Sequence, residues 1–337
     1  MTLASARAKL TAVTVTASAP AKLMLYGEHA VVYGVPCVVT AVDLRVRVSV
    51  ALRRDDRVTI RTPMLAESFT IRTDEVMCGA PVPPAVHFVV AALRACWQTT
   101  APCGLDLHTR ADFSHSYGLG SSSAVTVATV KALGEATGAS LDAQQVFRLS
   151  YDAVLDAQRG IGSGYDVAAA AFGGTLYYIT PGDVIEPLTR EELPLVIGYS
   201  GIKASTTEWV RRVAELRERH PALVQHIWRL TQDLVDEARG ALMRRDWAAC
   251  GRLMDINHGL LSALGVSTGP LDSLVHAARA AGAYGAKLSG AGGGDCMIAL
   301  ADEDRRSSVT AALNGSGLPA AGVVTVRTGA EGVRIEA

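Results

Sequence analysis

A run of small residues late in the chain constrains the fold most, because it excludes a regular helix or strand there. Residues 289–295 read Ser-Gly-Ala-Gly-Gly-Gly-Asp, and the apolar stretch 296–300 follows at once. Glycine weakens a regular element by about 0.5–1 kcal/mol per residue, so packing alone does not select so many. A flexible linker is the alternative, but a linker does not lead directly into a strand-like segment. We therefore expect a loop whose backbone another group approaches closely.

A second glycine loop, at 117–123, reads Tyr-Gly-Leu-Gly-Ser-Ser-Ser and precedes a helical pattern at 122–137. Its glycines let the backbone approach a ligand, and its serines offer hydroxyls. The helix N-terminus behind it presents unpaired N–H groups and a partial positive charge, which suits a phosphate. A plain tight turn before a helix is the alternative. The loop is not a Walker A sequence, since no Gly-Lys-Ser/Thr follows, and it is not Gly-x-Gly-x-x-Gly.

Two further segments concentrate polar residues in apolar surroundings. Residues 160–166 read Gly-Ile-Gly-Ser-Gly-Tyr-Asp and deliver Asp166 to the start of a helix of small residues. Such an aspartate is commonly an N-cap, and a base held by a glycine-rich turn is the sharper interpretation. Lys22, Glu28 and His29 lie close together in the apolar stretch 20–30. A salt bridge or a cap would explain them, but their concentration favours a functional site.

The hydrophobic pattern predicts α+β secondary structure without regular βαβ alternation. Strands are expected at 13–16, 38–42, 45–52, 58–61, 69–72, 105–109, 175–179, 194–199, 296–300, 323–327 and 333–335. Helices are expected at 85–98, 122–137, 141–155, 205–219, 221–240 and 246–264, with an alanine-rich helix between 164 and 173. Ser140 is the expected N-cap of the helix at 141–155.

A length of 337 residues suits two domains. The pattern is interrupted at 182–193, where a proline-glycine pair and a charged segment occur, so we divide the chain into residues 1–185 and 186–337. The hydrophobic content of 49% supplies material for a core, and a net charge of −1 gives no sign of a nucleic-acid or membrane surface. The six cysteines form no CxxC, which predicts free thiols. We expect a cytoplasmic protein without a membrane span.

The segments 20–30, 118–124 and 287–296, in this order and spacing, resemble the three motifs of the GHMP kinases. The resemblance covers about 22–300, and three motifs in register are far more specific than one. It implies an ATP-dependent small-molecule kinase. The implied fold has an N-terminal domain like domain 2 of ribosomal protein S5 and a ferredoxin-like C-terminal domain.

Within that family the segments resemble two subgroups of the mevalonate pathway. Residues 19–36 and 257–288 are similar to mevalonate kinases, which phosphorylate an alcohol. Residues 117–124, 160–174 and 290–296 are similar to phosphomevalonate kinases, which phosphorylate a phosphate. Mevalonate is the preferred acceptor and phosphomevalonate the alternative, for which Lys203, Arg159 and His115 are the candidate extra cations.

The resemblance implies a role for each matching residue. Asp166 would be the base, or the carboxylate that orients the acceptor oxygen, and Lys22 would stabilise negative charge on that oxygen. The phosphates of ATP would be bound by Gly118, Leu119, Gly120, Ser121, Ser122, Ser123, Gly290, Ala291, Gly292 and Gly293. The acceptor would be contacted by Glu28, His29, Ser163, Gly164 and Thr206. Mg²⁺ would be held by Ser122 and Asp156.

Two positions depart from the family pattern. Ser114 stands where a proline usually precedes the first loop glycine, so the entry to the loop can differ. Leu155 stands where mevalonate kinases carry a metal-binding glutamate, and Asp156 and Asp152 are the nearest substitutes.

Two other function classes are less consistent with the sequence than a kinase. A ligand-sensing relative without catalysis would keep the loops, but the presence of both Lys22 and Asp166 argues against it. A nucleic-acid module is disfavoured by the near-zero net charge. The expected partner is a small-molecule substrate, and a homodimer is left open.

Overall fold

The computed structural model of the chain describes residues 14–114, 117–319 and 321–336. Its first half contains β1 (Thr14–Tyr26), η2 (Ala30–Tyr33), β2 (Cys37–Leu52), β3 (Arg57–Arg61), β4 (Phe69–Arg72), α1 (Thr73–Cys78), η3 (Pro84–Val86), α2 (His87–Trp97), β5 (Leu105–Ala111), α3 (Ser121–Ala136), α4 (Ala143–Ala157) and α5 (Tyr165–Phe172). Its second half contains β6 (Thr175–Ile179), β7 (Val184–Thr189), β8 (Leu195–Tyr199), α6 (Thr206–Arg219), α7 (Pro221–Met243), α8 (Trp247–Ala263), α9 (Gly269–Ala280), β9 (Gly285–Ser289), β10 (Cys296–Leu300), α10 (Glu303–Asn314), β11 (Gly322–Val324) and β12 (Arg334–Ile335).

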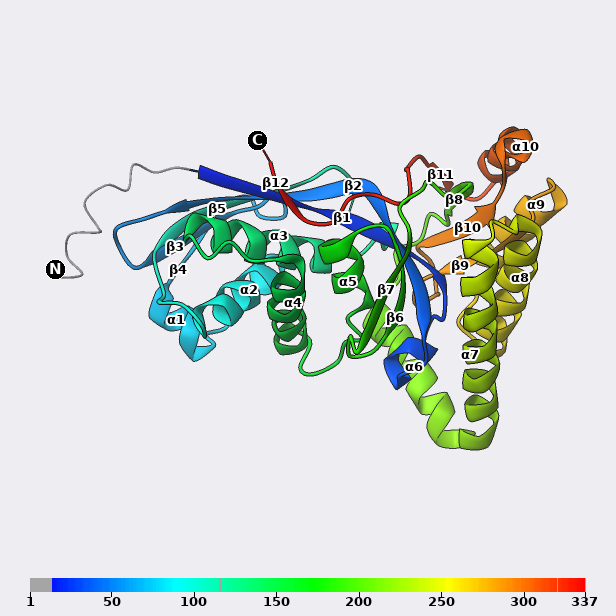
Figure 1. The fold of residues 1–337 in the computed structure, drawn as a ribbon, viewed down its shortest axis with the longest axis horizontal. Helices are drawn as coiled ribbons and strands as arrows, with labels where there is room; N and C mark the ends of the chain where they lie inside the picture. Colours follow the sequence, from blue (N-terminus) through cyan, green and yellow to red (C-terminus); the bar gives the residue numbers. More distant parts are fainter. Residues whose placement is uncertain (1–13, 115–116, 320, 337) are drawn as a thin grey trace.

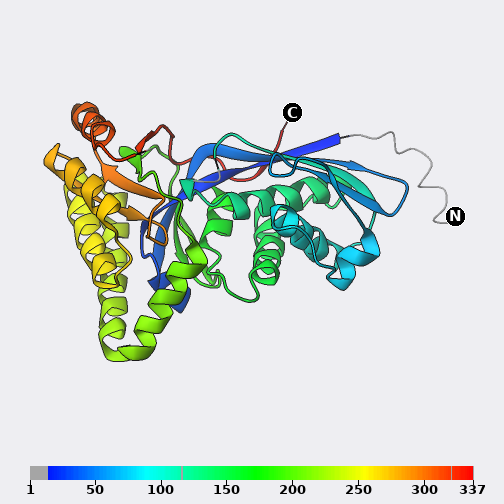
Figure 2. The same cartoon turned by 180° about the vertical axis from the view of Figure 1, so that it is seen from behind.

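The larger of two sheets has eight strands and carries the first helices on one face. Its order is β12-β1-β2-β5-β3-β4, with β6 paired to β2 and β7 to β6. Helices α2 to α5 gather beneath it, as Figures 1 and 2 show from opposite sides. All its strand pairs are antiparallel except β3 with β5.

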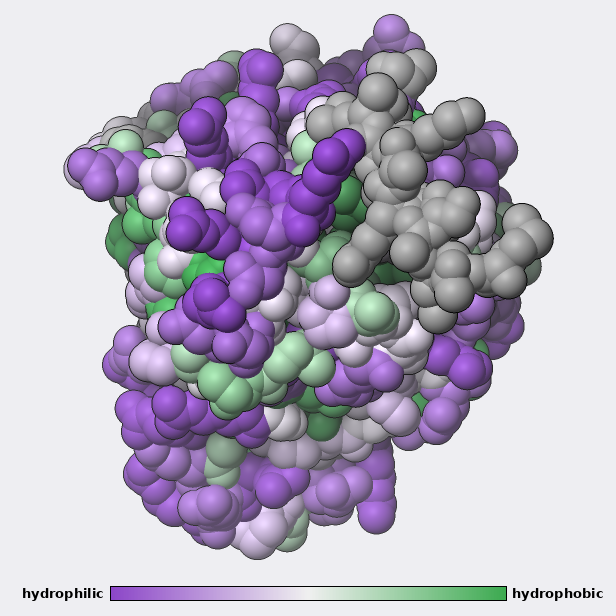
Figure 3. Space-filling model, turned by 90° about the vertical axis from the view of Figure 1, so that its left-hand side faces the viewer, coloured by the Kyte–Doolittle hydropathy of each residue, from purple (hydrophilic) through white to green (hydrophobic). Residues whose placement is uncertain are grey.

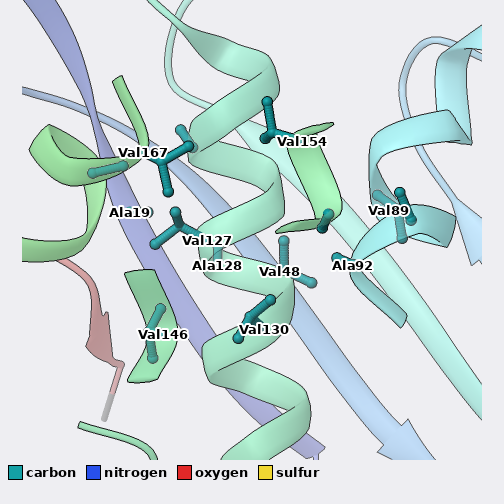
Figure 4. Close-up of a cluster of buried hydrophobic side chains, with 14 of the residues drawn as sticks. Ala19, Val48, Val89, Ala92, Val127, Ala128, Val130, Val146, Val154 and Val167 are labelled. Carbon is teal, nitrogen blue, oxygen red and sulfur yellow. The ribbon is translucent and has the colours of Figure 1, made fainter. Parts of the chain in front are cut away.

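The core of this half lies between the sheet and α3. Val48 of β2 and Ala19 of β1 face Val127 and Val130 of α3, and all are buried (Figure 4). Full burial of a valine side chain stabilises the fold by about 1.5–3 kcal/mol, so this contact fixes the position of α3 beneath the sheet. The N-terminus of α3 is thereby held beside β1.

The smaller sheet is antiparallel, with the order β11-β8-β10-β9, and packs against the helices of the second half. Helices α7 and α8 lie side by side at this end of the molecule (Figures 1 and 2). This two-domain arrangement agrees with the expected fold class.

The end of β1 connects the two halves. The Tyr26 hydroxyl donates to the carbonyl of Cys250 on α8 (2.8 Å), and the Ser289 hydroxyl of β9 donates to the carbonyl of Met24 (2.8 Å). Apolar side chains from β1, α7 and β10 form a shared buried cluster around these bonds. Residues at the end of β1 therefore face both halves of the chain.

Several elements differ from those expected. The strand predicted at 13–16 runs on to Tyr26, and those predicted at 38–42 and 45–52 are one strand, β2. The predicted cap Ser140 is wrong: Asp142 is the N-cap of α4, where its carboxylate accepts the N–H of Gln145 (2.8 Å) and the Gln145 side chain accepts in return. Helices α1, α9 and α10 were not predicted.

The expected boundary at 185/186 falls inside β7, which is a strand of the larger sheet. The C-terminal strand β12 also belongs to that sheet, where Ala17 pairs with Ile335. The smaller sheet takes its strands from residues 195–199, 285–289, 296–300 and 322–324. The division at 185/186 stays a prediction.

The surface at the α1 end is largely hydrophilic, with apolar residues in small separate areas (Figure 3). Across the described ranges of the chain, no helix is both long enough and apolar enough to cross a bilayer.

Candidate active site

The side chain of Lys22 extends from β1 toward the loop before α3. It is 7% exposed, and its ammonium donates to the carbonyl of Gly118 (3.3 Å). The main-chain N–H of Lys22 donates to the carbonyl of Leu119 (2.9 Å), which ties the loop to the strand. Burial lowers the pKa of Lys22, and the nearby carboxylates of Asp166 and Asp295 oppose that shift. The loop and the lysine therefore form one unit.

Asp166 lies in the first turn of α5. One of its oxygens accepts the Ser123 hydroxyl of α3 (2.5 Å), and the other accepts the N–H of Val167 (3.0 Å). Lys22 and Asp166 are near enough for the carboxylate to affect the lysine pKa. Even so, no ion pair within 4.0 Å joins them in the part of the chain that the structure describes. The ammonium of Lys22 thus contacts the loop before α3, and the carboxylate of Asp166 contacts the first turn of the same helix.

The loop before α3 needs glycine at two positions. Gly118 and Gly120 have φ of 71° and 79°, a left-handed conformation that glycine adopts without strain. A Cβ on Gly118 would lie 2.2 Å from Oδ2 of Asp295, and one on Gly120 would lie 3.0 Å from Cγ of Lys22. Within the helix the first N–H to bond back is that of Ala124, to the carbonyl of Gly120 (3.1 Å). The N–H groups of the three serines before it are the orphan donors of the helix N-terminus.

A cavity of about 390 Å³ opens beside these serines. Its polar lining residues are Thr62, Thr109, Arg110, Ser121, Ser122 and Lys203, and the rest of its lining is apolar. The apolar part is contributed by Val46, Pro63, Met64, Pro84, Ala85, Phe88, Val89, Ala111, Phe113 and Val125. Sequence reasoning did not find this cavity, because its lining comes from segments that only the fold brings together.

The second glycine loop, 290–294, is approached closely, as expected, but by protein groups. A Cβ on Gly292 would lie 2.2 Å from the carbonyl oxygen of Val266, and one on Gly293 would lie 1.8 Å from Nε1 of Trp209. The Gly293 N–H also donates to the Val266 carbonyl (2.9 Å). Gly290, with φ of 102°, has open space where a side chain would be. The loop therefore packs against Trp209 of α6 and against Val266, and Gly290 is its position with open space for a side chain.

The carboxylate of Glu28 is paired with another side chain of the protein and is not exposed. It forms an ion pair with the ammonium of Lys287 on β9, and both side chains are fully buried. Burial raises the pKa of Glu28 and the Lys287 charge opposes that shift. One Glu28 oxygen, Oε2, has no hydrogen-bond partner among the residues of known placement. The structure thus contains the salt bridge that is the alternative interpretation of the segment 20–30.

His29 is buried beside the second glycine loop. Its ring lies 3.0 Å (Nε2) from the carbonyl oxygen of Ala291, so Nε2 carries the proton that it donates. Burial lowers the pKa of His29 to about 4, so the ring is neutral at pH 7. Its φ of 61° is positive, which is uncommon for a residue other than glycine.

The other three residues predicted to contact the acceptor lie in different elements of the fold. Ser163 is buried, and its carbonyl accepts the hydroxyls of Tyr178 (2.6 Å) and Thr180 (3.0 Å). Gly164 is the left-handed N-cap of α5, and Thr206 is exposed as the first residue of α6.

Asp156 pairs with Arg94 of α2 at 2.5 Å, and its side chain is 48% exposed. Searching the described residues finds no group of three or more His, Cys, Asp or Glu side chains that could hold a metal ion. The Asp156 carboxylate therefore already has a cationic partner, and its metal role stays a prediction.

The ion pair between Asp295 and Lys203 was not predicted from the sequence. The ammonium of Lys203 lies 3.3 Å from Oδ1 of Asp295, which also accepts the N–H of Ala204 (3.0 Å). The position of Asp295, directly after the glycine run, was a signal in the sequence. Its partner, 92 residues away, was not readable there.

Comparison with known proteins gives the family context. Residues 86–174 match the description "GHMP kinases N terminal domain" and residues 238–317 match "GHMP kinases C terminal". A mevalonate kinase from Pyrococcus horikoshii is 39% identical, and the match covers 96% of this chain and 98% of that protein.

Two solved structures extend the comparison. The L. major mevalonate kinase in complex with R-mevalonate has a TM-score of 0.73 at 26% identity, covering 92% of this chain and 94% of that one. A Streptococcus pneumoniae phosphomevalonate kinase in complex with phosphomevalonate and AMPPNP has a TM-score of 0.75 at 21% identity, covering 93% and 100%. The second likeness shows the fold alone.

Proposed function

The chain belongs to the GHMP kinase family, and from that premise we propose that it phosphorylates mevalonate with ATP, giving 5-phosphomevalonate and ADP. The observation that carries the kinase assignment is that Lys22 contacts the loop before α3 while Asp166 contacts Ser123 in the first turn of that helix. The choice of mevalonate rests on the 39% identity, over 96% of this chain, to a mevalonate kinase. This is a step in the formation of isoprenoid precursors.

The donor phosphates bind at the start of α3. The free N–H groups of Ser121, Ser122 and Ser123 and the partial positive charge of the helix end suit a polyphosphate. Glycine at 118 and 120 removes the side chains that would cover these groups. The apolar cavity of about 390 Å³ next to Ser121 is suited to the base and sugar of the nucleotide.

The acceptor binds between Lys22 and Asp166. Asp166 takes the proton of the acceptor hydroxyl. At the same time the oxygen of that hydroxyl forms the new bond to the γ-phosphorus. The bond from that phosphorus to the bridging oxygen breaks, and its electron pair leaves with ADP. Lys22 stabilises the negative charge on the acceptor oxygen, and the Ser123 hydroxyl holds Asp166 in place. Positioning and charge neutralisation are the main requirements of phosphoryl transfer.

The residues present fit a magnesium ion bound mainly through the nucleotide. Mg²⁺ keeps several waters and commonly takes only one or two protein ligands plus substrate phosphates. The Ser122 hydroxyl lines the cavity at the helix N-terminus and would be one ligand. When bound, the ion neutralises phosphate charge. Asp156 is left out of this site because it pairs with Arg94.

Phosphomevalonate is the second candidate, and it would need cations for its extra phosphate. Lys203 pairs with Asp295 and lines the cavity of the donor side. Arg159 is exposed at the end of α4, and His115 lies outside the described residues. The positions of Lys203 and Arg159 favour mevalonate, which needs no cation for a second phosphate.

A coupled assay for ADP release, run with mevalonate and with phosphomevalonate, tests the proposal. We expect turnover with mevalonate and a product that carries one phosphate by mass spectrometry. A product with two phosphates would favour the second candidate. ATP binding without ADP release across a panel of acceptors would favour a ligand-sensing relative and contradict the kinase.

A further inference from the structure

Asp295 has an unusual position at the point where the two glycine loops meet. It is 7% exposed, and its φ of 56° is left-handed, a conformation costly for a residue with a Cβ. Its Oδ2 lies so close to Gly118 that only glycine fits there. The surrounding backbone holds it from both sides, with its N–H donating to Ile202 (2.7 Å) and its carbonyl accepting from Ser200 (2.9 Å). The fold therefore fixes a carboxylate directly behind the phosphate loop.

This carboxylate holds the segment that precedes α6. Its Oδ1 accepts the N–H of Ala204 (3.0 Å) and pairs with the ammonium of Lys203 (3.3 Å). Lys203 is 48% exposed, so it is held at the surface of the site and not buried within it. A lysine side chain loses rotamer entropy when it is ordered, so a fixed carboxylate that already holds Lys203 lowers the entropy that ligand binding must still remove.

Lys203 lies on the donor side. It lines the same cavity as Ser121 and Ser122, the first residues of α3, and Arg110 of β5 is a second cation in that lining. Lys22 approaches the same loop from β1, where it donates to Gly118. The two lysines thus come to the phosphate loop from different elements, and both lie near Asp295.

We propose that Lys203 is a second cation for the phosphates of the bound nucleotide, and that Asp295 is the residue that positions it. This inference rests on the proposed function, since it needs the nucleotide polyphosphate at the start of α3. A carboxylate near a phosphate repels it, so Asp295 is not itself a phosphate ligand. Its pairing with Lys203 offsets that repulsion and aims the ammonium at the cavity.

The test compares the binding of ADP with that of adenosine, measured by calorimetry with Mg²⁺ present. We expect Lys203→Met to weaken ADP binding by ~10-fold or more, the usual size for a charge-assisted contact, and adenosine binding by less than ~2-fold. Lys203→Arg keeps the charge and should restore most of the ADP affinity. Arg211→Met is the matched control, because Arg211 is an exposed cation on α6 that pairs with Glu215.

Asp295→Asn tests the positioning role. The amide keeps an acceptor for Ala204 but loses the ion pair, so ADP binding should weaken a few-fold, less than in Lys203→Met. The double variant should bind ADP no more weakly than Lys203→Met alone. Additive losses would overturn the positioning role, and an unchanged ADP affinity in Lys203→Met would overturn the cation role. So would an equal loss of ADP and adenosine binding, or a rise in the KM of the acceptor with ADP affinity unchanged.

Failure of this inference is distinguishable from failure of the proposed function. Wild-type protein that binds ADP without turning over mevalonate would contradict only the choice of acceptor, and the ADP titrations would still decide the role of Lys203. Wild-type protein that binds neither ADP nor ATP would overturn both.

Discussion

Lys22 and Lys287 are both buried lysines near the same site, and they differ in what their ammonium groups contact. Burial lowers the pKa of each. Lys287 forms a direct ion pair with Glu28, whereas Lys22 donates to a peptide carbonyl and feels several carboxylates without pairing with one among the described residues. Burial alone therefore does not identify a catalytic lysine. An ammonium that retains free donors toward a site can act on a ligand, and one that is fully paired holds the fold together.

The largest expected effect separates the two lysines by activity. Lys22→Met should lower kcat by ~10³-fold or more, because a cation aimed at developing charge is worth several kcal/mol in a closed site. Asp166→Asn should have a loss of similar order, since it removes the base. ADP affinity should change little in both variants, as measured by calorimetry. Near-normal turnover in either variant would refute the assignment.

The second-largest expected effect distinguishes Lys22 from Lys287 by their contributions to the free energy of unfolding. Lys287→Met leaves Glu28 buried without its cation, which should lower the free energy of unfolding by about 3–5 kcal/mol in urea titrations. Lys22→Met should cost much less, because it removes a buried charge without stranding a paired one. Adding Glu28→Gln to Lys287→Met should recover part of the loss. The comparison fails if Lys287→Met keeps wild-type stability and loses turnover instead.

The pH dependence of turnover sharpens the difference further. Lys22 acts as a cation, so kcat should fall as pH rises through its pKa, by about tenfold per pH unit above it. Because burial lowers that pKa, the decline should begin below the range of an ordinary lysine. The profile is measured with saturating substrates, alongside circular dichroism to confirm folding. The double variant Lys287→Met with Glu28→Gln should show the same fall of kcat at alkaline pH as the wild type.

The smallest effect concerns Asp156, the carboxylate that was predicted to bind the metal, in contrast to the catalytic Asp166. Asp156→Asn removes an exposed pair with Arg94, so stability should change by about 0–1 kcal/mol. Its kcat and its dependence on Mg²⁺ concentration should stay within ~2-fold of wild type, the usual scale for surface substitutions away from a site. A rise in the Mg²⁺ requirement of an order of magnitude would restore the predicted metal role.

Local patterns predicted most of the elements, and the errors have physical causes. The gap between the two strands predicted within β2 coincides with a shift in the pairing register of β2 with β1. The partner of β1 jumps from Arg45 to Val42 between Pro20 and Ala21, so the strand continues through an irregularity. Asp142 displaced Ser140 as the cap because its reciprocal bonds with Gln145 satisfy two backbone groups at once.

The site was predictable where its chemistry is local. Gly118, Gly120 and Asp166 stand in short motifs whose geometry follows from glycine and a helix start. The partners of Glu28 and Asp295 could not be predicted, because Lys287 and Lys203 lie 259 and 92 residues away along the chain. Long-range pairing depends on how the two sheets meet, and no local pattern encodes that.

The pairing of β12 with β1 has a consequence for how the molecule is made. β1 carries Lys22 and is among the first described segments to be synthesised, yet one of its edges is covered only when residues 334–335 arrive. Until then that edge offers unpaired backbone groups, a template on which another chain can add a strand. A chain that ended before β12 would therefore leave this edge of β1 uncovered at Ala17 and Ser18 and open to pairing with another chain.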